Sequence, residues 1–483
     1  MFPGFTESQG MCRFRSTAAL LVLGLCCPPA CAQEIDDAVV VIRRTPMKSR
    51  GATIQELVPG TVLDVYDAKG NWLLVSDKRT GWISKRDVAT PRRAVEIFTD
   101  RIQKNPKDAS AYVARGQALQ ETGQIEEAID DLDVALKLDP KNVAALIARG
   151  SALAEDDEIK NAFDDFDAAL KIDPRSAEAL FSRGKLSYEE KESAEAISDL
   201  TACLQLCPEH MAAYTYRAAA RIDRREPELA IADATRAIKL NPLSPFALAC
   251  RGAARGMTGE VDQALADLNE SIRLDPDDSR ARMSRAGVWY QSGQFDKALA
   301  DADEAIRLSP ESSAAHTNRG MIWIRKNDFD KALAEFDEAI RLDPDEATVY
   351  VRRASVWAKT GKPDKALADC AEAIRIDPTD PAGYAGQAWI LGTSADPKYR
   401  DGKRAVESAT KACELSGWKN ANCLGTLAAA YAESGDFKQA IESQTRALDR
   451  LKAEKMPGDD LKKFEERLAL YKSGQPFREE PKK

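Results

Sequence analysis

The side chains with the most reactive chemistry are few, and they form no recognisable catalytic motif. Histidine occurs only at His210 and His316, which excludes a histidine-rich metal site and an HExxH zinc helix. The sequence has neither a phosphate-binding Gly-x-x-x-x-Gly-Lys-Ser/Thr loop nor a Gly-x-Ser-x-Gly nucleophile turn. Cys207 and His210 could form a thiolate–imidazole dyad, but one spacing of three residues at a corner of the chain is weak support. The sequence therefore predicts no catalytic residue, no metal and no cofactor.

Arginine and acidic side chains recur in a pattern that points to ion pairs inside the protein. Arginine occurs eight times at intervals of 34 residues, and an acidic residue follows each arginine after 16 residues. These structural pairs include Arg115 with Asp131, Arg285 with Asp301, and Arg353 with Asp369. Further along the chain both charges are lost together, at Gln387 with Ser408 and at Leu427 with Ser443. Because removing one partner of a partly buried pair is costly, the joint loss predicts direct contact and a structural role.

Six cysteines follow residue 32, and two of them are predicted to be neighbours. Cys413 and Cys423 occupy repeat positions that elsewhere hold a large aliphatic and a small side chain, so they are expected to meet between repeats. In an oxidising compartment such a pair can form a disulfide. The alternative is a pair of buried thiols that act as small apolar groups. Cys203 and Cys207, one helical turn apart, are expected to be free.

The spacing of the prolines indicates which elements carry these residues. Nine prolines follow one another at intervals of 34 residues: Pro106, Pro140, Pro174, Pro208, Pro242, Pro276, Pro310, Pro344 and Pro378. Within one interval, 279–312, apolar residues at three- and four-residue spacings form two runs on either side of Ser292-Gly293. This pattern predicts two amphipathic helices joined by a tight turn, with the proline preventing the second helix from continuing. Such units bury their apolar faces only by stacking, so the expected fold is a solenoid.

Small residues at two positions of each repeat complete the pattern. The eighth position holds glycine or alanine and the twentieth holds alanine, which allows two helix backbones to approach closely. These features resemble the tetratricopeptide repeat (TPR) family, whose 34-residue helix–turn–helix has small residues at positions eight and twenty and proline at thirty-two. The resemblance implies a right-handed superhelix of helix hairpins.

Ten repeats are expected within a solenoid that spans residues 93–454. They begin at residues 109, 143, 177, 211, 245, 279, 313, 347, 381 and 421. A lone helix at 93–105 is expected to open the stack. The ninth repeat carries an insertion around 393–402 and lacks the closing proline.

The resemblance also implies that the first helix of each repeat lines a concave groove that holds segments of partner proteins. Positions 2, 5, 9 and 12 share one face of that helix and differ most between repeats. In the fifth to ninth repeats this partner-binding groove is expected to present Phe246, Met257, Met283, Tyr290, Met321, Ile324, Val351 and Trp389. Methionines and aromatics suit the capture of an apolar peptide. The alternative is that these side chains only pack neighbouring helices together.

Residues 33–91 differ in character from the repeats. Short β-branched runs alternate with turn residues at 38–42, 61–65, 72–76 and 81–84. The pattern predicts a small barrel or meander of about five strands. Its order resembles a bacterial SH3-like domain, with Gly81-Trp82-Ile83 as a late hairpin. The resemblance implies binding to cell-wall peptides or protein segments, and Trp72 and Trp82 either line that site or close a small core.

The N-terminus is predicted to be an export signal. Arg13 and Arg15 precede an apolar run at 18–25 and a small-residue cleavage site, Ala30-Cys31-Ala32, so residues 1–32 are expected to be a signal peptide. The apolar run is too short to span a bilayer. A lipid-anchored form is the alternative, because cysteines lie near the cleavage site. The mature chain is therefore expected in the periplasm or cell envelope, without a transmembrane segment.

At the other end, residues 455–474 are predicted to form a capping helix. Leu461, Phe464, Leu468 and Tyr471 share one of its faces, and charged residues cover the other. A solenoid needs such a polar outer side where it ends in water. Residues 475–483 are predicted to be a disordered tail.

The composition fits this plan and excludes one class of partner. The net charge is −9, with 69 Lys and Arg against 78 Asp and Glu, which does not favour nucleic-acid binding. The expected fold class is thus mainly α, a TPR solenoid preceded by a small all-β SH3-like barrel. The expected function is an exported, non-catalytic scaffold that binds partner proteins or peptides. The alternative is a cell-wall protein that binds peptidoglycan through the SH3-like domain.

Overall fold

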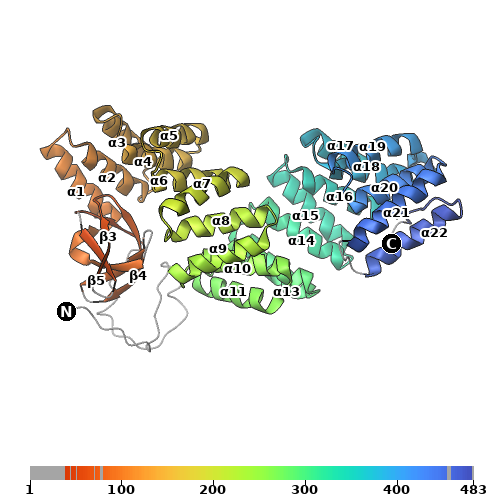
Figure 1. Cartoon of the computed structure of the whole chain (residues 1–483), viewed down its shortest axis with the longest axis horizontal. Coiled ribbons are helices and arrows are strands. Elements are labelled where there is room, and N and C mark those ends of the chain that lie inside the picture. Colours follow the sequence, from red (N-terminus) through yellow and green to blue (C-terminus); the bar gives the residue numbers. More distant parts are fainter. Residues whose placement is uncertain are drawn as a thin grey trace. The chain divides into compact units, whose positions relative to one another are not determined.

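The computed structural model describes residues 38–43, 45–49, 52–69, 71–76, 80–453 and 458–480. The predicted signal peptide, residues 1–32, lies outside the described residues. The chain divides into two compact units, Met1–Pro276 and Asp277–Lys483. Strands occupy the start of the first unit and helices make up the rest of the described chain (Figure 1).

The first unit begins with one antiparallel sheet. Its strands are β1 (Ala38–Val41), β2 (Thr45–Ser49), β3 (Ala52–Leu57), β4 (Val62–Lys69), β5 (Trp72–Ser76), β6 (Thr80–Ser84) and β7 (Val88–Ala89). Their order in the sheet is β3-β2-β6-β5-β4-β1-β7. The four predicted runs are strands, but the expected total of about five is wrong, because the described residues form a sheet of seven strands. The sequence of β2, with Pro46 inside it, and that of β3 lack a clear alternation of apolar and polar residues.

The sheet buries one face on itself and also packs against the first helices. Met47, Leu57 and Ile83 belong to the core inside the sheet. Val40 instead packs with α1 (Pro91–Lys104) and α2 (Ala109–Gln120) in a second cluster. The expected opening helix is therefore present as α1, and it joins the β domain to the repeats through a shared core.

The remaining helices of the first unit form consecutive hairpins. They are α3 (Ile125–Leu138), α4 (Val143–Glu155), α5 (Ile159–Ile172), α6 (Ala177–Glu189), α7 (Ser193–Leu206), α8 (Met211–Asp223), α9 (Pro227–Leu240), α10 (Pro245–Thr258) and α11 (Val261–Leu274). Hairpin partners such as α4 and α5 pack along their length, and each first helix also contacts its predecessor. This is the stacked arrangement that the 34-residue period predicted.

The second unit continues the pattern. Its helices are α12 (Ser279–Gln291), α13 (Phe295–Leu308), α14 (Ser313–Arg325), α15 (Phe329–Leu342), α16 (Ala347–Lys359), α17 (Pro363–Ile376), α18 (Pro381–Thr393), α19 (Gly402–Leu415), α20 (Ala421–Glu433), α21 (Phe437–Ala453) and α22 (Gly458–Lys472). In both units the first helix of every repeat begins at the expected residue. The insertion of the ninth repeat contains a short 3-10 turn, Pro397–Tyr399, between α18 and α19.

In the first eight repeats, the volumes at positions eight and twenty-four compensate one another. Where position eight is glycine, position twenty-four is large: Gly116 with Leu132, Gly150 with Phe166, Gly184 with Leu200, Gly252 with Leu268, and Gly320 with Phe336. Where position eight is alanine, position twenty-four is small: Ala218 with Ala234, Ala286 with Ala302, and Ala354 with Cys370. A Cβ added at each of these five glycines would lie within 3.0 Å of the large partner or of the residue beside it. The two positions therefore share one fixed volume between the helices.

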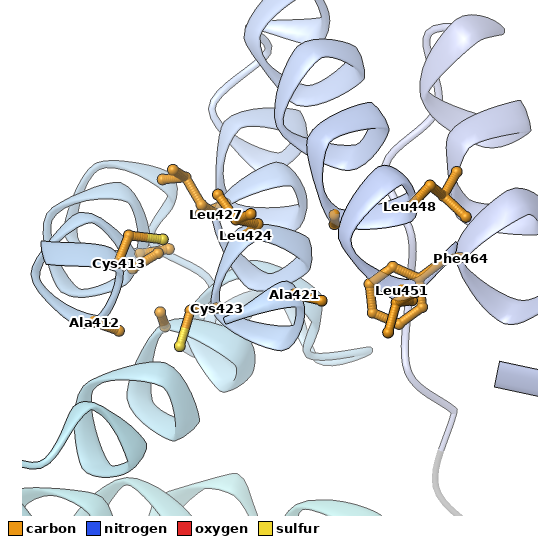
Figure 2. Close-up of a cluster of buried hydrophobic side chains, with 14 of the residues drawn as sticks. Ala412, Cys413, Ala421, Cys423, Leu424, Leu427, Leu448, Leu451 and Phe464 are labelled. Carbon is orange, nitrogen blue, oxygen red and sulfur yellow. The ribbon is translucent and has the colours of Figure 1, made fainter. Parts of the chain in front are cut away.

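The end of the second unit is closed by α22, as predicted. Phe464 and Tyr471 are buried, and Leu461 and Leu468 pack against the same part of the stack. Figure 2 shows Phe464 beside Leu448 and Leu451 of α21. A Cβ at Gly425 of α20 would lie only 2.7 Å from the Phe464 ring, so the capping helix packs closely on the last repeat.

Candidate functional site

The paired arginines and carboxylates meet inside the hairpins. Arg115 donates from Nε and Nη2 to the two carboxylate oxygens of Asp131, at 2.6 and 2.7 Å. The same two-point geometry joins Arg285 to Asp301 and Arg353 to Asp369. Asp131, Asp301 and Asp369 are each only 6% exposed. The structure therefore brings each of these predicted pairs together, with the geometry of strong charge-assisted hydrogen bonds.

Several of the same arginines have a further acceptor that the pairing pattern did not reveal. Arg149 donates from Nη1 to Asp133 of the preceding repeat at 2.5 Å, while its other donors bind Asp165. Arg353 reaches Asp337 in the same way, at 2.6 Å. The hydrogen bonds to Asp165 hold the pKa of Arg149 above its ordinary value. These arginines thus tie consecutive repeats together.

The ninth and tenth repeats replace the ion pair with neutral contacts. Ser408 donates to the side-chain oxygen of Gln387 at 2.7 Å, so a hydrogen bond occupies the place of the ion pair. Leu427 and Ser443 are both buried. These substitutions agree with a structural role for the charges, because a repeat keeps its fold when both are absent.

Both histidines also have structural contacts. His210 caps α8, accepting a hydrogen bond from the Ala213 backbone at 3.2 Å through Nδ1, and its ring lies 4.4 Å from that of Phe181. His316 Nδ1 lies 2.8 Å from Glu335, the carboxylate that also pairs with Arg319. Within the described part of the chain, no group of three or more His, Cys, Asp or Glu side chains is placed to hold a metal ion.

Cys413 and Cys423 lie in the same buried apolar cluster, on α19 and α20 (Figure 2). Both are free thiols in this structure. Burial raises the pKa of Cys413 to about 12, which makes it a poor nucleophile at neutral pH. The observed arrangement is that of small apolar groups, and a disulfide under oxidising conditions remains a prediction.

The expected groove residues fall in both units and are half-buried. In the first unit, Phe246 packs edge-on against Tyr216, with ring centroids 5.5 Å apart, and Met257 follows on the same helix, α10. In the second unit, Met283 and Tyr290 of α12 pack in a cluster with residues of α13 and α14. Phe246, Met283 and Tyr290 therefore contribute to packing, and all four side chains keep part of their surface exposed.

Arginines surround the candidate residues of the second unit. The guanidinium of Arg325 lies 5.3 Å from the ring centroid of Tyr290, and Arg352 Nη1 lies 3.1 Å from Sδ of Met321. Ile324 packs in the same cluster as Met321, and Val351 packs beside the next second helix. The surface thus combines apolar side chains with cations.

Trp389 differs from the other candidates because the end of the chain covers it. The Phe477 ring lies 5.8 Å from the Trp389 ring, and Glu479 accepts a hydrogen bond from Trp389 Nε1. The prediction of a disordered tail is therefore wrong for residues 475–480, and residues 481–483 lie outside the described part. Specific contacts with α18 and α20 hold this segment, and contacts so distant in sequence leave no periodic pattern that could predict them.

Trp72 and Trp82 lie on one face of the β-sheet. Trp72 pairs with Ser84 and Trp82 with Leu74, so the two tryptophans project from the same side of β5 and β6. The buried residues of these strands, Leu73 among them, point to the other side. Both tryptophans are half-buried and neither belongs to the core of the sheet. Both interpretations, a binding site and closure of a small core, therefore remain predictions.

Comparison with known proteins identifies the helical part. The tetratricopeptide repeat family model matches residues 90–143, 113–177, 147–210, 258–313 and 317–381, together about half of the chain. Comparison with curated proteins gives no match. Within the described residues, no helix has both the length and the apolar character needed to cross a membrane.

Comparison with solved structures gives matches at low identity. The APC/C hetero-tetramer Cut9–Hcn1 is 15% identical, with 74% of this chain and 76% of that chain covered and a TM-score of 0.51. Yeast Tom70 is 16% identical over 79% of this chain and 92% of its own, with a TM-score of 0.46. A tetratricopeptide repeat protein of Parabacteroides merdae is 20% identical over 51% and 98%, with a TM-score of 0.44. With its hairpins, its small-residue packing and its match to the family model, the chain belongs to the tetratricopeptide repeat family.

Proposed function

We propose that the chain is an exported, non-catalytic scaffold that holds partner proteins in the cell envelope. Membership of the TPR family supports a role in protein–protein interaction. Export rests on the basic and apolar residues and the small-residue cleavage site within residues 1–32. The proposal rests mainly on one observation, that some repeat positions pack the helices together and others stay partly exposed. Glycine, alanine and the Arg–acid pairs hold the hairpins together, whereas methionines and aromatics on the first helices stay half-exposed.

The surface that we propose for partner binding lies in the second unit, where apolar side chains and an arginine occur together. Met283, Tyr290 and Met321 come from two consecutive first helices, α12 and α14, with Arg325 against the Tyr290 ring. Flexible thioethers and an aromatic ring adapt to apolar side chains, and the neighbouring guanidinium offers charge at the rim. A partner segment with apolar anchors and nearby acidic residues matches this chemistry.

Replacing Tyr290 and Met321 together by alanine tests this surface. Hot-spot truncations commonly cost more than about 1 kcal/mol each, so we expect roughly a tenfold or greater loss of partner capture. The measurement is crosslinking of the mature chain in native envelopes, followed by mass spectrometry of the attached proteins. Arg307→Ala, on the exposed face of α13, is the matched control and should leave capture unchanged. Undiminished capture by the double variant, with helicity intact, would contradict the proposal.

A second candidate function is binding to the cell wall through the β domain. It is supported by the placement of the half-buried Trp72 and Trp82 on one side of β5 and β6, since aromatic pairs of this kind suit peptide and sugar surfaces. Sedimentation with purified peptidoglycan separates the two candidates. Binding that depends on both tryptophans would support the second function. A chain that stays in the supernatant would rule it out.

A further inference from the structure

We propose that the end of the chain occupies, in cis, a peptide site on α18 and α20, and that the site recognises an extended aromatic–arginine–glutamate segment of a partner. The inference rests on the proposed scaffold function and adds to it a named site, a ligand chemistry and a built-in competitor. The competitor is Phe477-Arg478-Glu479, which lies about 90 residues after the surface that it covers.

The local sequence turns the chain back toward α18. Gly474 adopts a φ of 72°, and the backbone N–H of Gln475 donates to the carbonyl of Leu470 at 3.0 Å, which ends α22. Pro476 follows and cannot continue a helix. The three residues after it run as an extended segment along the end of α18.

An aromatic anchor forms the first part of the site. Phe477 lies against Trp389, and the Arg467 guanidinium lies 4.6 Å from the Trp389 ring centroid and 4.9 Å from that of Phe477. Burial lowers the pKa of Arg467, so the guanidinium is largely withdrawn from water. Desolvated cation–π contacts of this kind are worth up to about 2 kcal/mol. The site therefore selects an aromatic side chain at this position.

A short length of exposed backbone forms the second part. Glu479 donates its backbone N–H to the Thr393 carbonyl at 2.9 Å and forms a parallel β-bridge with Ser394. Thr393 and Ser394 lie where the insertion of the ninth repeat begins. The insertion thus supplies a strand-like edge that the other repeats lack, and such an edge pairs with an extended segment through main-chain groups alone.

An ion pair forms the third part. Arg478 Nη2 lies 2.5 Å from Glu433 Oε2, and Arg478 Nη1 donates to the Gly392 carbonyl at 3.3 Å. Arg400 lies 3.3 Å from the other oxygen of Glu433. Glu433 is therefore held in place on α20 and faces a cation of the bound segment. An acidic residue at the arginine position of a partner would meet repulsion here.

The tail is a tethered ligand with few contacts, which makes it displaceable. A short tether gives an effective concentration in the millimolar range, so even a weak intramolecular contact fills the site. A partner with the same three side chains and further contacts elsewhere on the scaffold can replace it. The tail then excludes from the site any partner that binds too weakly to displace it.

The test uses the full chain and a fluorescein-labelled peptide with the sequence of residues 474–483. In the chain variant Phe477→Ala with Glu479→Ala the site is open, and we expect this variant to bind the peptide at least tenfold more tightly than the wild-type chain. Glu480→Ala, a change at the exposed neighbouring residue, is the matched control and should behave as wild type. Fluorescence anisotropy reports the binding.

Substitutions in the peptide supply a second measurement that cannot disturb the fold of the chain. Peptides with Phe477→Ala or Arg478→Glu should lose binding to the opened variant. Absence of peptide binding to that variant would overturn the proposal, as would equal binding by the wild-type chain. The assay needs no native partner, so its failure would leave partner capture through Tyr290 and Met321 standing. Failure of that capture would likewise leave the peptide result intact.

Discussion

At the scale of single residues, the tightest constraint on the repeats is the volume shared by positions eight and twenty-four. Gly320 lies against Phe336, whereas the preceding repeat places Ala286 against Ala302. Close-packed interiors do not absorb an extra methyl group where a rigid ring already fills the space. The choice of glycine or alanine is therefore made by the partner residue rather than by helix propensity.

Gly320→Ala tests this constraint. The added Cβ would lie 2.8 Å from Cε1 of Phe336, so we expect the free energy of unfolding to fall by about 1–3 kcal/mol. In a Phe336→Ala background the same change should carry no cost, because the ring that it meets is absent. Urea unfolding of the four proteins of this double-mutant cycle measures the coupling.

Gly287→Ala provides the control for this cycle. Gly287 lies in α12, and a Cβ there would meet nothing within 4 Å. Without a clash, the higher helix propensity of alanine should stabilise the protein by about 0.5–1 kcal/mol. Equal and additive effects of Gly320→Ala in both backgrounds would contradict the volume argument.

At the scale of helices, the buried ion pairs set how the two members of a hairpin face each other. Arg285 on α12 holds Asp301 on α13 at two points, at 2.8 and 2.6 Å. The ninth repeat makes the equivalent contact with Gln387 and Ser408. The charged pair and the neutral pair thus both fit these positions, and the two members change together.

Transferring the neutral pair into the sixth repeat tests this conclusion. Asp301→Ser alone removes the two-point acceptor of the largely buried Arg285 guanidinium and should cost about 3 kcal/mol in the free energy of unfolding. The double variant, which adds Arg285→Gln, should lose less than the single variant. Urea unfolding followed by circular dichroism provides the measurement. Glu304→Ala, at an exposed pair on α13, should leave the midpoint unchanged. A double variant that is less stable than the single one would refute the matched-pair account.

At the scale of the whole molecule, each of the two units has a cap on its helices, and the two caps differ in kind. The β domain packs on α1 and α2 through Val40, Phe98 and Ala114. In the second unit, α22 and the returning tail form the cap. A solenoid in which each repeat contacts only its neighbours loses stability from uncovered ends, so both caps protect the repeats beside them.

Gly60→Val tests the cap formed by the β domain. Gly60 has a φ of 95°, and a Cβ there would lie 2.9 Å from Cα of Ala114, so valine should push the sheet away from α2. We expect amide exchange in α1 and α2 to accelerate at least tenfold, while α20 and α21 stay unchanged. Gly123→Val is the control, because Gly123 has a similar φ of 76° but open space around it. Equal exchange in the two variants would show that α2 does not depend on the cap.

Most of the architecture could be predicted from the sequence, because the contacts of a solenoid recur at a fixed, short separation along the chain. Each repeat start, the contact of Arg115 with Asp131 and the apolar face of α22 follow from spacings within or between adjacent repeats. The strands β2 and β3 were missed, because their residues are held by pairing across the sheet rather than by their own pattern. The contact of the groove residue Trp389 with Glu479, about 90 residues later, was also missed.

The sequence by itself determined the repeat, the hairpin and the residues that join its two helices, because these relations recur at fixed separations along the chain. The tertiary structure alone decided that Arg149 reaches a further carboxylate, that Val40 joins the sheet to the helices, and that Phe477 returns to Trp389. Such contacts depend on where the folded backbone brings distant residues. No single period in the sequence encodes these contacts, so only the three-dimensional structure shows them.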